Sequence, residues 1–263
     1  MITIQALQLP AVLPDAFWHS FLTFVSEERR AQAARFVHQA DAYRSVLGEV
    51  LTRITLSELT GVPAKELSFS RNAYGKPCLV HNPHVPFNVS HSGDWIALIA
   101  GGTAEVGVDV EKIAPIDLQI AERFFSPQEN AYLAAMPADQ QNHTFYRLWT
   151  LKESYIKAIG TGLSLPLDSF AILPKGLGQG PADELCWQCT QTGHAELTGQ
   201  NQSNSQSVHQ AEGRNDRVMQ HRFYSQPLDA QHMLAACASD GELPMNPEIV
   251  TLDQIYTRFV EGR

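Results

Sequence analysis

The sequence is poor in cysteine, in positive charge and in long apolar runs. Among its 263 residues there are four cysteines, and 19 lysines and arginines stand against 28 aspartates and glutamates, which gives a formal net charge of −9. The few cysteines suit a reducing compartment. A general nucleic-acid binder needs a dominant basic surface, so this balance argues against nucleic acid as a partner. An anionic ligand would have to be held by a local cluster of bases.

Signals for membrane insertion and export are missing from the pattern. No stretch approaches the roughly 20 apolar residues of a membrane span. The first residues, MITIQALQLPAV, lack the basic start of a signal peptide. We therefore expect a cytoplasmic protein with no membrane partner. The motif CWQC at 186–189 has the spacing of a metal or redox site, but no second pair or histidine arrangement completes a zinc site.

What the sequence does contain is a clear order of strands and helices. A strand is expected at 2–8, and helical spacing predicts a helix over 41–59 with Asp41 as N-cap. The segment PFNVSHSGDWIALIAGG predicts a strand, a polar turn that carries Ser90 and His91, and a second strand.

Three short segments of the first half have echoes in the second. ARF is echoed by ERFF, the pair Tyr-Arg at 43–44 by the pair at 146–147, and DWIALIAGG by QHMLAACAS. Each match is weak alone, and together they favour an internal duplication. We expect an α+β protein with an N-terminal half at 1–105, a C-terminal half at 106–263, and a mobile polar insertion near 199–216.

Two carboxylates share one face of the segment GVDVEKI at 107–113. Valines alternate with the other residues, which is the period of a β-strand, so Asp109 and Glu111 point to the same side about 7 Å apart. Like charges held this close repel each other unless a positive group lies beside them. Gly107 would leave room for a bulky group next to the carboxylates. The alternative is a solvated strand edge with no partner.

A third carboxylate lies on a helix predicted over 145–162. The apolar stripe of this helix leaves Glu153 and Lys157 one turn apart on another face. They could form an ordinary surface ion pair, or Glu153 could meet the strand that carries Asp109 and Glu111. Three carboxylates from two elements, with room for waters and a ligand, describe a Mg²⁺ site better than a Ca²⁺ or zinc site, and Mg²⁺ implies a phosphate.

Candidate phosphate binders lie upstream, and each has an ordinary alternative. Lys76 follows a glycine in the turn-like NAYGKP, and Ser90 and His91 lie in the polar turn. The remaining bases, each of which could equally be part of a solvated helix face, are Arg29, Arg30 and Arg44. By contrast, Glu129 closes the capping box SPQE and needs no catalytic explanation.

Taken together, these motifs match a known family. NAYGKP, FNVSHS, GVDVEKI, RFF and LWTLKESYIKAIGTGLSLPL, in this order, resemble the motifs of the surfactin-type (Sfp-like) 4′-phosphopantetheinyl transferases. The resemblance covers residues 17–172 and, more loosely, 221–240. A strand of the form G-(V/I)-D-(V/I)-E followed by W-x-x-K-E-x-x-x-K is specific in combination.

The resemblance implies a fold and an activity. Family members move the phosphopantetheine arm of coenzyme A onto a serine of an acyl or peptidyl carrier protein, release 3′,5′-ADP and need Mg²⁺. Their fold is a pseudodimer of two similar α/β halves, with coenzyme A in the cleft between them. We expect this protein to act as a monomer on a carrier of fatty acid, polyketide or nonribosomal peptide synthesis, among which the sequence does not choose.

The resemblance also implies roles for individual residues. Asp109, Glu111 and Glu153 would hold Mg²⁺ on the pyrophosphate. Lys157 would contact the phosphate near the reacting phosphorus, and Glu153 would take the hydroxyl proton, directly or through a water. Coenzyme A would be held by Ser90, His91 and Lys76 at its phosphates, by Tyr74 and Gly75 along the adenine, and by Arg29 and Arg44 at the 3′-phosphate.

One residue departs from the family pattern, and two other activities stay open. Gln32 stands where some members have a second lysine, so the 3′-phosphate clamp lacks one base, for which Arg30 could substitute. The same carboxylates could serve a Mg²⁺-dependent hydrolase of coenzyme A or a nucleotide diphosphate, which transfers to water. A second alternative is a non-catalytic carrier-binding protein, against which stands the presence of every charged residue that the mechanism needs.

Overall fold

The computed structural model describes residues 1–176, 183–191 and 218–261; the insertion predicted at 199–216 lies outside them. The described helices are α1 (Asp15–Phe24), α2 (Glu27–Ala33), α3 (Gln39–Thr60), α4 (Ile120–Phe124), α5 (Pro127–Ala134), α6 (Ala138–Ile159) and α7 (Leu252–Glu261). The strands are β1 (Ile2–Gln8), β2 (Phe69–Arg71), β3 (Pro77–Leu79), β4 (Phe87–Ser92), β5 (Trp95–Gly101), β6 (Val106–Lys112), β7 (Phe170–Lys175), β8 (Asp183–Gln191), β9 (Val218–Met219), β10 (Arg222–Asp229), β11 (His232–Ala238) and β12 (Glu248–Val250). The predicted α+β class is confirmed.

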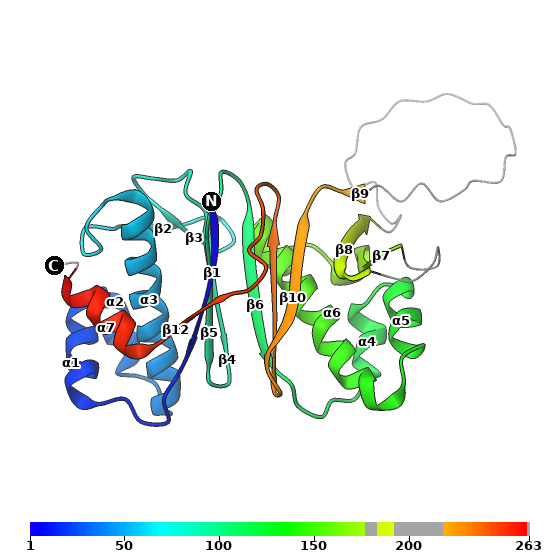
Figure 1. Cartoon of the computed structure of the whole chain (residues 1–263), viewed down its shortest axis with the longest axis horizontal. Coiled ribbons are helices and arrows are strands. Elements are labelled where there is room, and N and C mark those ends of the chain that lie inside the picture. Colours follow the sequence, from blue (N-terminus) through cyan, green and yellow to red (C-terminus); the bar gives the residue numbers. More distant parts are fainter. Residues whose placement is uncertain (177–182, 192–217, 262–263) are drawn as a thin grey trace, which may run out of the picture.

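Two sheets of similar plan form the middle of the molecule. One has the order β12-β1-β5-β4 and the other β10-β11-β6. In each, a central strand (β5 or β11) pairs antiparallel with the hairpin strand that precedes it (β4 or β10) and with a first strand (β1 or β6). Helices α1, α2, α3 and α7 cover one side of this pair of sheets, and α4, α5 and α6 cover the other (Figure 1).

The first strands of the two sheets have the same register. Gln5, the fourth residue of β1, pairs with Leu98 of β5. Asp109, the fourth residue of β6, pairs with Ala235 of β11, and Leu98 and Ala235 are each the fourth residue of their strand. The two halves therefore place the same strand positions at the same points of their sheets.

Three apolar cores hold the layers together. The first lies among α1, α3, α7 and one face of β5, and the second among α5, α6, β7 and one face of β11. The third lies between the two sheets, where Ile4 and Ile99 of the first sheet meet the face of β6 that carries Val108. Strand β6 is thus buried on both faces, because its valines face the third core and its other residues face α6.

Strands β4 and β6 meet through side chains. The side chains of Asn88, Ser90 and Ser92, which alternate along β4, accept hydrogen bonds from the amides of Val108, Val110 and Lys112 at 3.0, 3.4 and 3.0 Å. Because both residue series ascend together, the two strands run parallel. The two sheets are joined here by specific side chains and not by a main-chain ladder.

The predicted helix stops are confirmed at Gly61 and Gly160, whereas two helix starts are shifted: the helix predicted over 145–162 is α6, which begins at Ala138, and the helix predicted over 41–59 also begins earlier. Serine and glutamate of SPQE form the predicted capping box on α5. Helices α3 and α6 end at Gly61 and Gly160, whose φ angles of 72° and 73° suit glycine. Helix α3 begins two residues before Asp41, however, and its N-cap is His38. Asp41 is instead an acidic residue of the first turn, where it also favours the helix.

The reason given for Gly107 was wrong. A Cβ atom at this position would lie 2.0 Å from the carbonyl oxygen of Ser154 and 2.4 Å from the amide nitrogen of Ala158. The space beside β6 is therefore filled by the backbone of α6, which approaches the strand as closely as only glycine permits. Gly107 brings the helix to the carboxylates and leaves no room for a ligand on its own account.

Residues 248–261 pack on the sheet and core of the N-terminal half. Strand β12 pairs parallel with β1, and Ile255 and Phe259 of α7 lie in the first core. The division of the chain at residues 105 and 106 stays a prediction, but this last segment, assigned to the second half by its position in the sequence, lies against the first.

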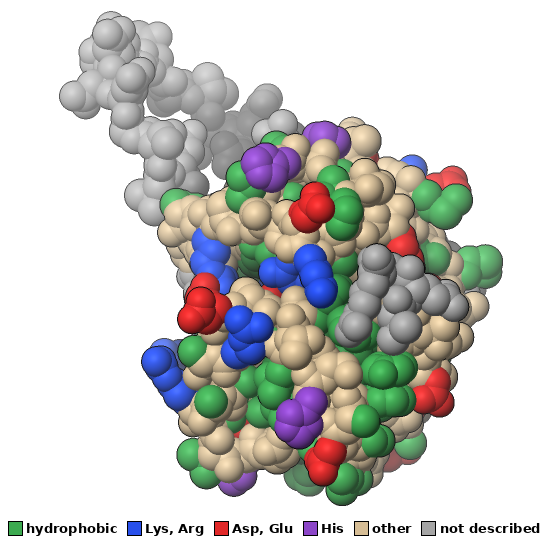
Figure 2. All heavy atoms as spheres, turned by 90° about the vertical axis from the view of Figure 1, so that its left-hand side faces the viewer, with side chains coloured by type: hydrophobic (Ala, Val, Ile, Leu, Met, Phe, Trp, Pro, Cys, Tyr) green, Lys and Arg blue, Asp and Glu red, His purple; other side chains and the backbone are tan. Residues whose placement is uncertain are grey.

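The outer helices carry mixed charge. On the face covered by the helices of the N-terminal half, Lys and Arg side chains lie close to Asp and Glu side chains (Figure 2). Arg258 of α7, for example, donates to Glu248 at 3.0 Å. Within residues 1–176, 183–191 and 218–261, no helix is both long and apolar enough to cross a membrane.

Candidate active site where the two sheets meet

Asp109 lies at the centre of a polar cluster on β6. Its side chain is buried, with 2% of the residue exposed. One carboxylate oxygen, Oδ1, accepts hydrogen bonds from Ser90 Oγ at 2.9 Å and from Lys157 Nζ at 2.6 Å. The other oxygen, Oδ2, is buried and has no hydrogen-bond partner among the described residues. A buried carboxylate oxygen without a partner is costly, and a bound cation would satisfy it.

Glu111 and Glu153 extend this cluster. Burial raises the pKa of both carboxyls, and the negative charge of Asp109 raises it further. Ser92 Oγ donates to Glu111 Oε2 at 2.8 Å. The structure therefore brings together the three carboxylates that the sequence singled out, from β6 and from α6, and their mutual repulsion favours a positive ligand.

The three carboxylates are not closed around a common point. Within the described parts of the chain, no three His, Cys, Asp or Glu side chains form a group that could by itself hold a metal ion. All four cysteines are free thiols, including the two of CWQC. The chemistry of the donor set fits Mg²⁺, because all three groups are carboxylates and none is a thiolate or an imidazole. Asp109 Oδ2, which has no hydrogen-bond partner among the described residues, could serve as a ligand.

Lys157 reaches across from α6 to the strands. Its ammonium donates to Asp109 and, at 2.9 Å, to Ser90. The side chain is 28% exposed, whereas that of Asp109 is 3% exposed. Lys157 thus pairs with the buried carboxylate of β6, and the alternative of an ordinary surface pair with Glu153 does not describe its contacts.

Lys152, one residue before Glu153, fixes the position of α6. Its Nζ lies 2.8 and 2.6 Å from the two carboxylate oxygens of Glu129 and 2.7 Å from the carbonyl oxygen of Phe170. Its residue is 1% exposed. Sequence reasoning missed this role. The signal was present, since Lys152 falls on the apolar stripe of the helix, four residues after Leu148 and three before Tyr155.

Ser90 and His91 do not lie in a turn, as the sequence analysis expected. Both belong to β4, and the turn of the hairpin is formed by Gly93 and Asp94. Alternation along the strand therefore sends them to opposite faces, with Ser90 buried and His91 exposed. Desolvation lowers the pKa of His91, and the neighbouring charges of Arg44 and Lys157 lower it further.

The arginines proposed for the 3′-phosphate already have protein partners. Arg29 donates to Glu49 at 2.9 Å and to Gln32 and Ser45 at 3.0 Å each. The departure at Gln32 thus has a local effect, because its side chain binds Arg29. Arg44 donates to the carbonyl oxygen of Gly93 at 2.6 Å and pairs with a carboxylate on its own helix.

Lys76 ties the N-terminal half to the C-terminal half. Its Nζ donates to the carbonyl oxygens of Val106 at 3.0 Å and Ala158 at 2.7 Å, which belong to β6 and α6. Desolvation lowers its pKa. In the same loop, Gly75 has a φ of 88° and Tyr74 is 60% exposed. The turn predicted for NAYGKP is confirmed.

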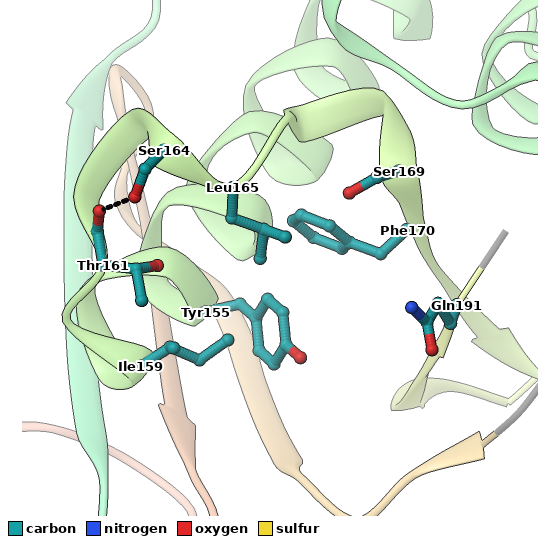
Figure 3. Close-up of a pocket in the computed structure, with 8 residues that line it drawn as sticks. All are labelled: Tyr155, Ile159, Thr161, Ser164, Leu165, Ser169, Phe170 and Gln191. Atoms are coloured by element: carbon teal, nitrogen blue, oxygen red, sulfur yellow. Dashed lines mark hydrogen bonds between the residues drawn. The ribbon is translucent and has the colours of Figure 1, made fainter. Parts of the chain in front are cut away.

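A separate hollow of about 330 Å³ lies on the other side of α6. Its apolar part is formed by Tyr155, Ile159, Leu165 and Phe170, with Gln191 at its edge (Figure 3). The rings of Tyr155 and Phe170 are 4.9 Å apart. Because a helix turns 100° per residue, Tyr155 and Ile159 point roughly opposite to Glu153 and Lys157, so this hollow is distinct from the carboxylate cluster.

Comparison with known protein families identifies the class. Residues 105–213 match the family described as the 4′-phosphopantetheinyl transferase superfamily, and residues 14–103 match that described as 4′-phosphopantetheinyl transferase, N-terminal. The chain therefore belongs to the 4′-phosphopantetheinyl transferase superfamily. The resemblance drawn from the motifs, and with it the prediction of a transferase enzyme, is confirmed.

Individual relatives agree with this assignment. The 4′-phosphopantetheinyl transferase ffp of Bacillus subtilis is 48% identical over 151 residues, or 57% of this chain and 67% of the relative. The 4′-phosphopantetheinyl transferase Sfp of Bacillus subtilis (strain 168) is 46% identical over 152 residues, or 58% and 67%. The human L-aminoadipate-semialdehyde dehydrogenase-phosphopantetheinyl transferase is 31% identical over 180 residues, or 63% and 58%.

Proposed function

We propose that this protein transfers the 4′-phosphopantetheine group of coenzyme A to a serine hydroxyl of an acyl or peptidyl carrier protein and releases 3′,5′-ADP. Membership of the family supports the reaction class. The single structural observation that carries the proposal is the buried oxygen Oδ2 of Asp109, which lacks a partner among the described residues and lies beside Glu111 and Glu153.

We further propose that the two halves form a pseudodimer and that coenzyme A lies in a cleft between them. The common register of β1 and β6 and the equal length of α3 and α6 support the first point. The contacts of Lys76 and of the β4 serines with the C-terminal half support the second, because residues assigned to one ligand come from both halves. The monomeric state, cytoplasmic location and lack of membrane or nucleic-acid partners stay predictions.

Asp109, Glu111 and Glu153 would hold Mg²⁺. When bound, the cation would neutralise the charge that builds on the pyrophosphate as the serine oxygen attacks phosphorus. The chain's own part is to present Asp109 Oδ2 from a rigid strand and to keep its Oδ1 occupied by Ser90 and Lys157. This leaves one oxygen of the buried carboxylate for the cation.

Glu153 is the proposed acceptor of the serine proton. Burial and the charge of Asp109 raise its pKa, which makes the carboxylate a stronger base than an ordinary glutamate. Lys157 is proposed to contact the phosphate near the reacting phosphorus. Its ammonium is partly exposed and lies at the same cluster, so it can bind an anion there while it orients Asp109.

The remaining residues are proposed to hold the nucleotide. His91 and Arg44 lie close enough for their charges to influence each other, and Tyr74 and Gly75 form an open turn. The proposed ligands also include Arg29, Lys76 and Ser90, although all three are bound to protein groups. We therefore expect these three to act largely by ordering the site.

Two other activities remain as outcomes of a test. A hydrolase of coenzyme A would use the same carboxylates but transfer to water, and a non-catalytic carrier-binding protein would use none of them. Family membership favours the transferase over both.

The test is the reaction itself. The protein, coenzyme A, Mg²⁺ and an apo carrier protein are incubated, the carrier is weighed by mass spectrometry, and the nucleotide product is identified. We expect one phosphopantetheine group on the carrier, release of 3′,5′-ADP, and loss of both with a chelator or with a carrier that lacks its serine. Nucleotide release with free phosphopantetheine would support the hydrolase. No product with several unrelated carriers would support the inert binder.

A further inference from the structure

Two serines of β4 each donate a hydrogen bond from their hydroxyl group to a carboxylate of β6. Ser90 Oγ donates to Asp109 Oδ1 at 2.9 Å, and Ser92 Oγ donates to Glu111 Oε2 at 2.8 Å. The two pairs lie two residues apart on parallel strands and therefore repeat the same geometry one step along the junction. Sequence analysis did not single out Ser92.

The backbone of β6 determines the direction of both hydroxyls. A serine hydroxyl has one proton to donate and two lone pairs to accept with. The amide of Val110 donates to Ser90 and that of Lys112 to Ser92, so one lone pair of each oxygen is occupied and the proton is turned to the carboxylate. Ser90 also accepts from Lys157, which fills its hydrogen-bonding capacity within the protein.

We propose that Ser90 and Ser92 are positioning residues, which fix one oxygen of Asp109 and one oxygen of Glu111 so that both carboxylates are held ready for the cation. This inference rests on the proposed function. It assigns Ser90 to the orientation of Asp109 and Lys157, because its hydroxyl donates to the carboxylate and accepts from the ammonium. It assigns Ser92 to the orientation of Glu111, since its hydroxyl donates to that carboxylate while it accepts from the backbone of β6.

Ser92 offers the cleaner test, because Ser90 also accepts a hydrogen bond from Lys157, so that its loss would disturb two side chains of the cluster. Mg²⁺ is titrated by isothermal calorimetry into Ser92→Ala, Ser92→Thr and wild-type protein, each saturated with coenzyme A, with Ser70→Ala as a matched control. Ser70 is an exposed strand serine whose hydroxyl donates to Cys78 Sγ at 3.8 Å and lies outside the carboxylate cluster.

We expect Ser92→Ala to raise the Mg²⁺ dissociation constant by about 10- to 100-fold, as removal of a hydrogen bond to a metal ligand commonly does. Ser92→Thr, which keeps the hydroxyl, should stay within about threefold of wild type. Ser70→Ala should not change the constant. In transfer assays, Ser92→Ala should need more Mg²⁺ for half-maximal rate while its kcat at saturating Mg²⁺ falls much less.

A double-mutant cycle separates positioning from general damage. If Ser92 acts through Glu111, Ser92→Ala should add nothing to the Mg²⁺ dissociation constant of Glu111→Gln. An equal constant for Ser92→Ala and wild type, or an additive effect in the Glu111→Gln background, would overturn the inference. If the wild-type protein itself neither binds Mg²⁺ nor modifies a carrier, the proposed function fails, and the inference fails with it.

Discussion

The two long helices have equal length and similar support, yet only one of them serves the candidate site. Helices α3 and α6 each span 22 residues and end at a left-handed glycine. Each carries a buried cation eight residues before that glycine, Arg53 in α3 and Lys152 in α6. Arg53 lies over the ring of Phe69 at 5.0 Å, and Lys152 lies over the ring of Phe170 at 4.2 Å. Each half therefore has a buried basic side chain that anchors its long helix against an aromatic ring.

The strands below these helices differ at the positions that carry chemistry. Gln5 in β1 has the register of Asp109 in β6, and Leu7 has that of Glu111. Gln5 is satisfied by neutral and acidic neighbours, since Thr55 donates to it at 2.7 Å and it donates to a glutamate. Both ends of the Gln5 amide therefore have hydrogen-bond partners, whereas Asp109 at the matching position has one carboxylate oxygen without a partner among the described residues.

The helices differ in the same way. Counting back from the final glycine, Ile54 and Glu58 stand where α6 has Glu153 and Lys157. Helix α6 packs mainly on β6, next to the carboxylates, whereas α3 packs mainly on β5. The comparison teaches that the fold supplies the scaffold in both halves, while close approach of one helix to its first strand creates the site in one. Four experiments test this, in order of the expected effect on the free energy of unfolding.

Replacing the buried basic side chain should destabilise the protein more at Lys152 in the C-terminal half than at Arg53 in the N-terminal half. Lys152→Met leaves the carboxylate of Glu129 buried without a counter-charge, which we expect to cost about 3–5 kcal/mol. Arg53→Met should cost less, because Glu49 keeps its hydrogen bond from Arg29. Urea unfolding of both variants measures the difference. Equal losses would show that the two supports are equivalent after all.

Gly107→Ala should separate the helix from the strand. The added methyl group would meet the backbone of α6, so we expect a loss of about 1–3 kcal/mol from overpacking. Carrier modification should fall steeply at temperatures where the variant is still folded, because Glu153 and Lys157 would move away from Asp109. Thr3→Ala, at the same register of β1, is the control and should leave the rate unchanged. A fully active Gly107→Ala enzyme would contradict the role given to this contact.

Glu49, the carboxylate that pairs with Arg53 in the N-terminal half, should make the stability of the protein depend on pH. Burial would raise the pKa of Glu49, but hydrogen bonds from Ser26, Arg53 and Arg29 outweigh it and hold the pKa below its ordinary value of 4.5. A group whose pKa is lowered by folding stabilises the folded state above the unfolded pKa and loses that effect as the pH falls through the folded pKa. The stability gap between wild type and Glu49→Gln should therefore shrink below pH 4.5. Unfolding curves at neutral and acidic pH give this gap; a constant gap would refute the ionic role.

Lys157→Ala should change stability least and activity strongly. The ammonium is 28% exposed and Asp109 keeps its hydrogen bond from Ser90, so we expect a smaller loss than for Lys152→Met, whose ion pair is buried on both sides. The rate of carrier modification should drop by at least about 100-fold, since the ammonium is the proposed phosphate contact. Glu58→Ala, the matching position of α3, should affect neither quantity. An unchanged rate in Lys157→Ala would leave this lysine with a structural role only.

Local signals predicted the elements and the three carboxylates well. Alternation in GVDVEKI gave β6, and the spacing of Glu153 and Lys157 on an amphipathic helix gave their shared face. Those patterns depend on neighbouring residues along the chain. The choice of Gly107 as a point of close approach depends instead on a helix that follows much later in the sequence, and no local pattern reveals which backbone will lie against it.

The contacts of the basic residues were beyond prediction for a similar reason. Lys76 and Arg29 were candidate phosphate binders by their place in a turn and on a helix, and the family resemblance assigned them to the phosphates of coenzyme A. In the fold, both side chains donate hydrogen bonds to protein groups of other segments: Lys76 to two carbonyl oxygens and Arg29 to a glutamate. Whether a long side chain is free depends on tertiary neighbours, which one-dimensional spacing does not specify.

The pairing of β12 with β1 has a consequence for the order in which the molecule is completed during synthesis. Val250, Ile255 and Phe259 belong to the core that is otherwise built from the first hundred residues. A growing chain can close the hairpins and helix of its second half while the core of its first half still lacks these three side chains. The half that leaves the ribosome first is therefore the one that is finished last.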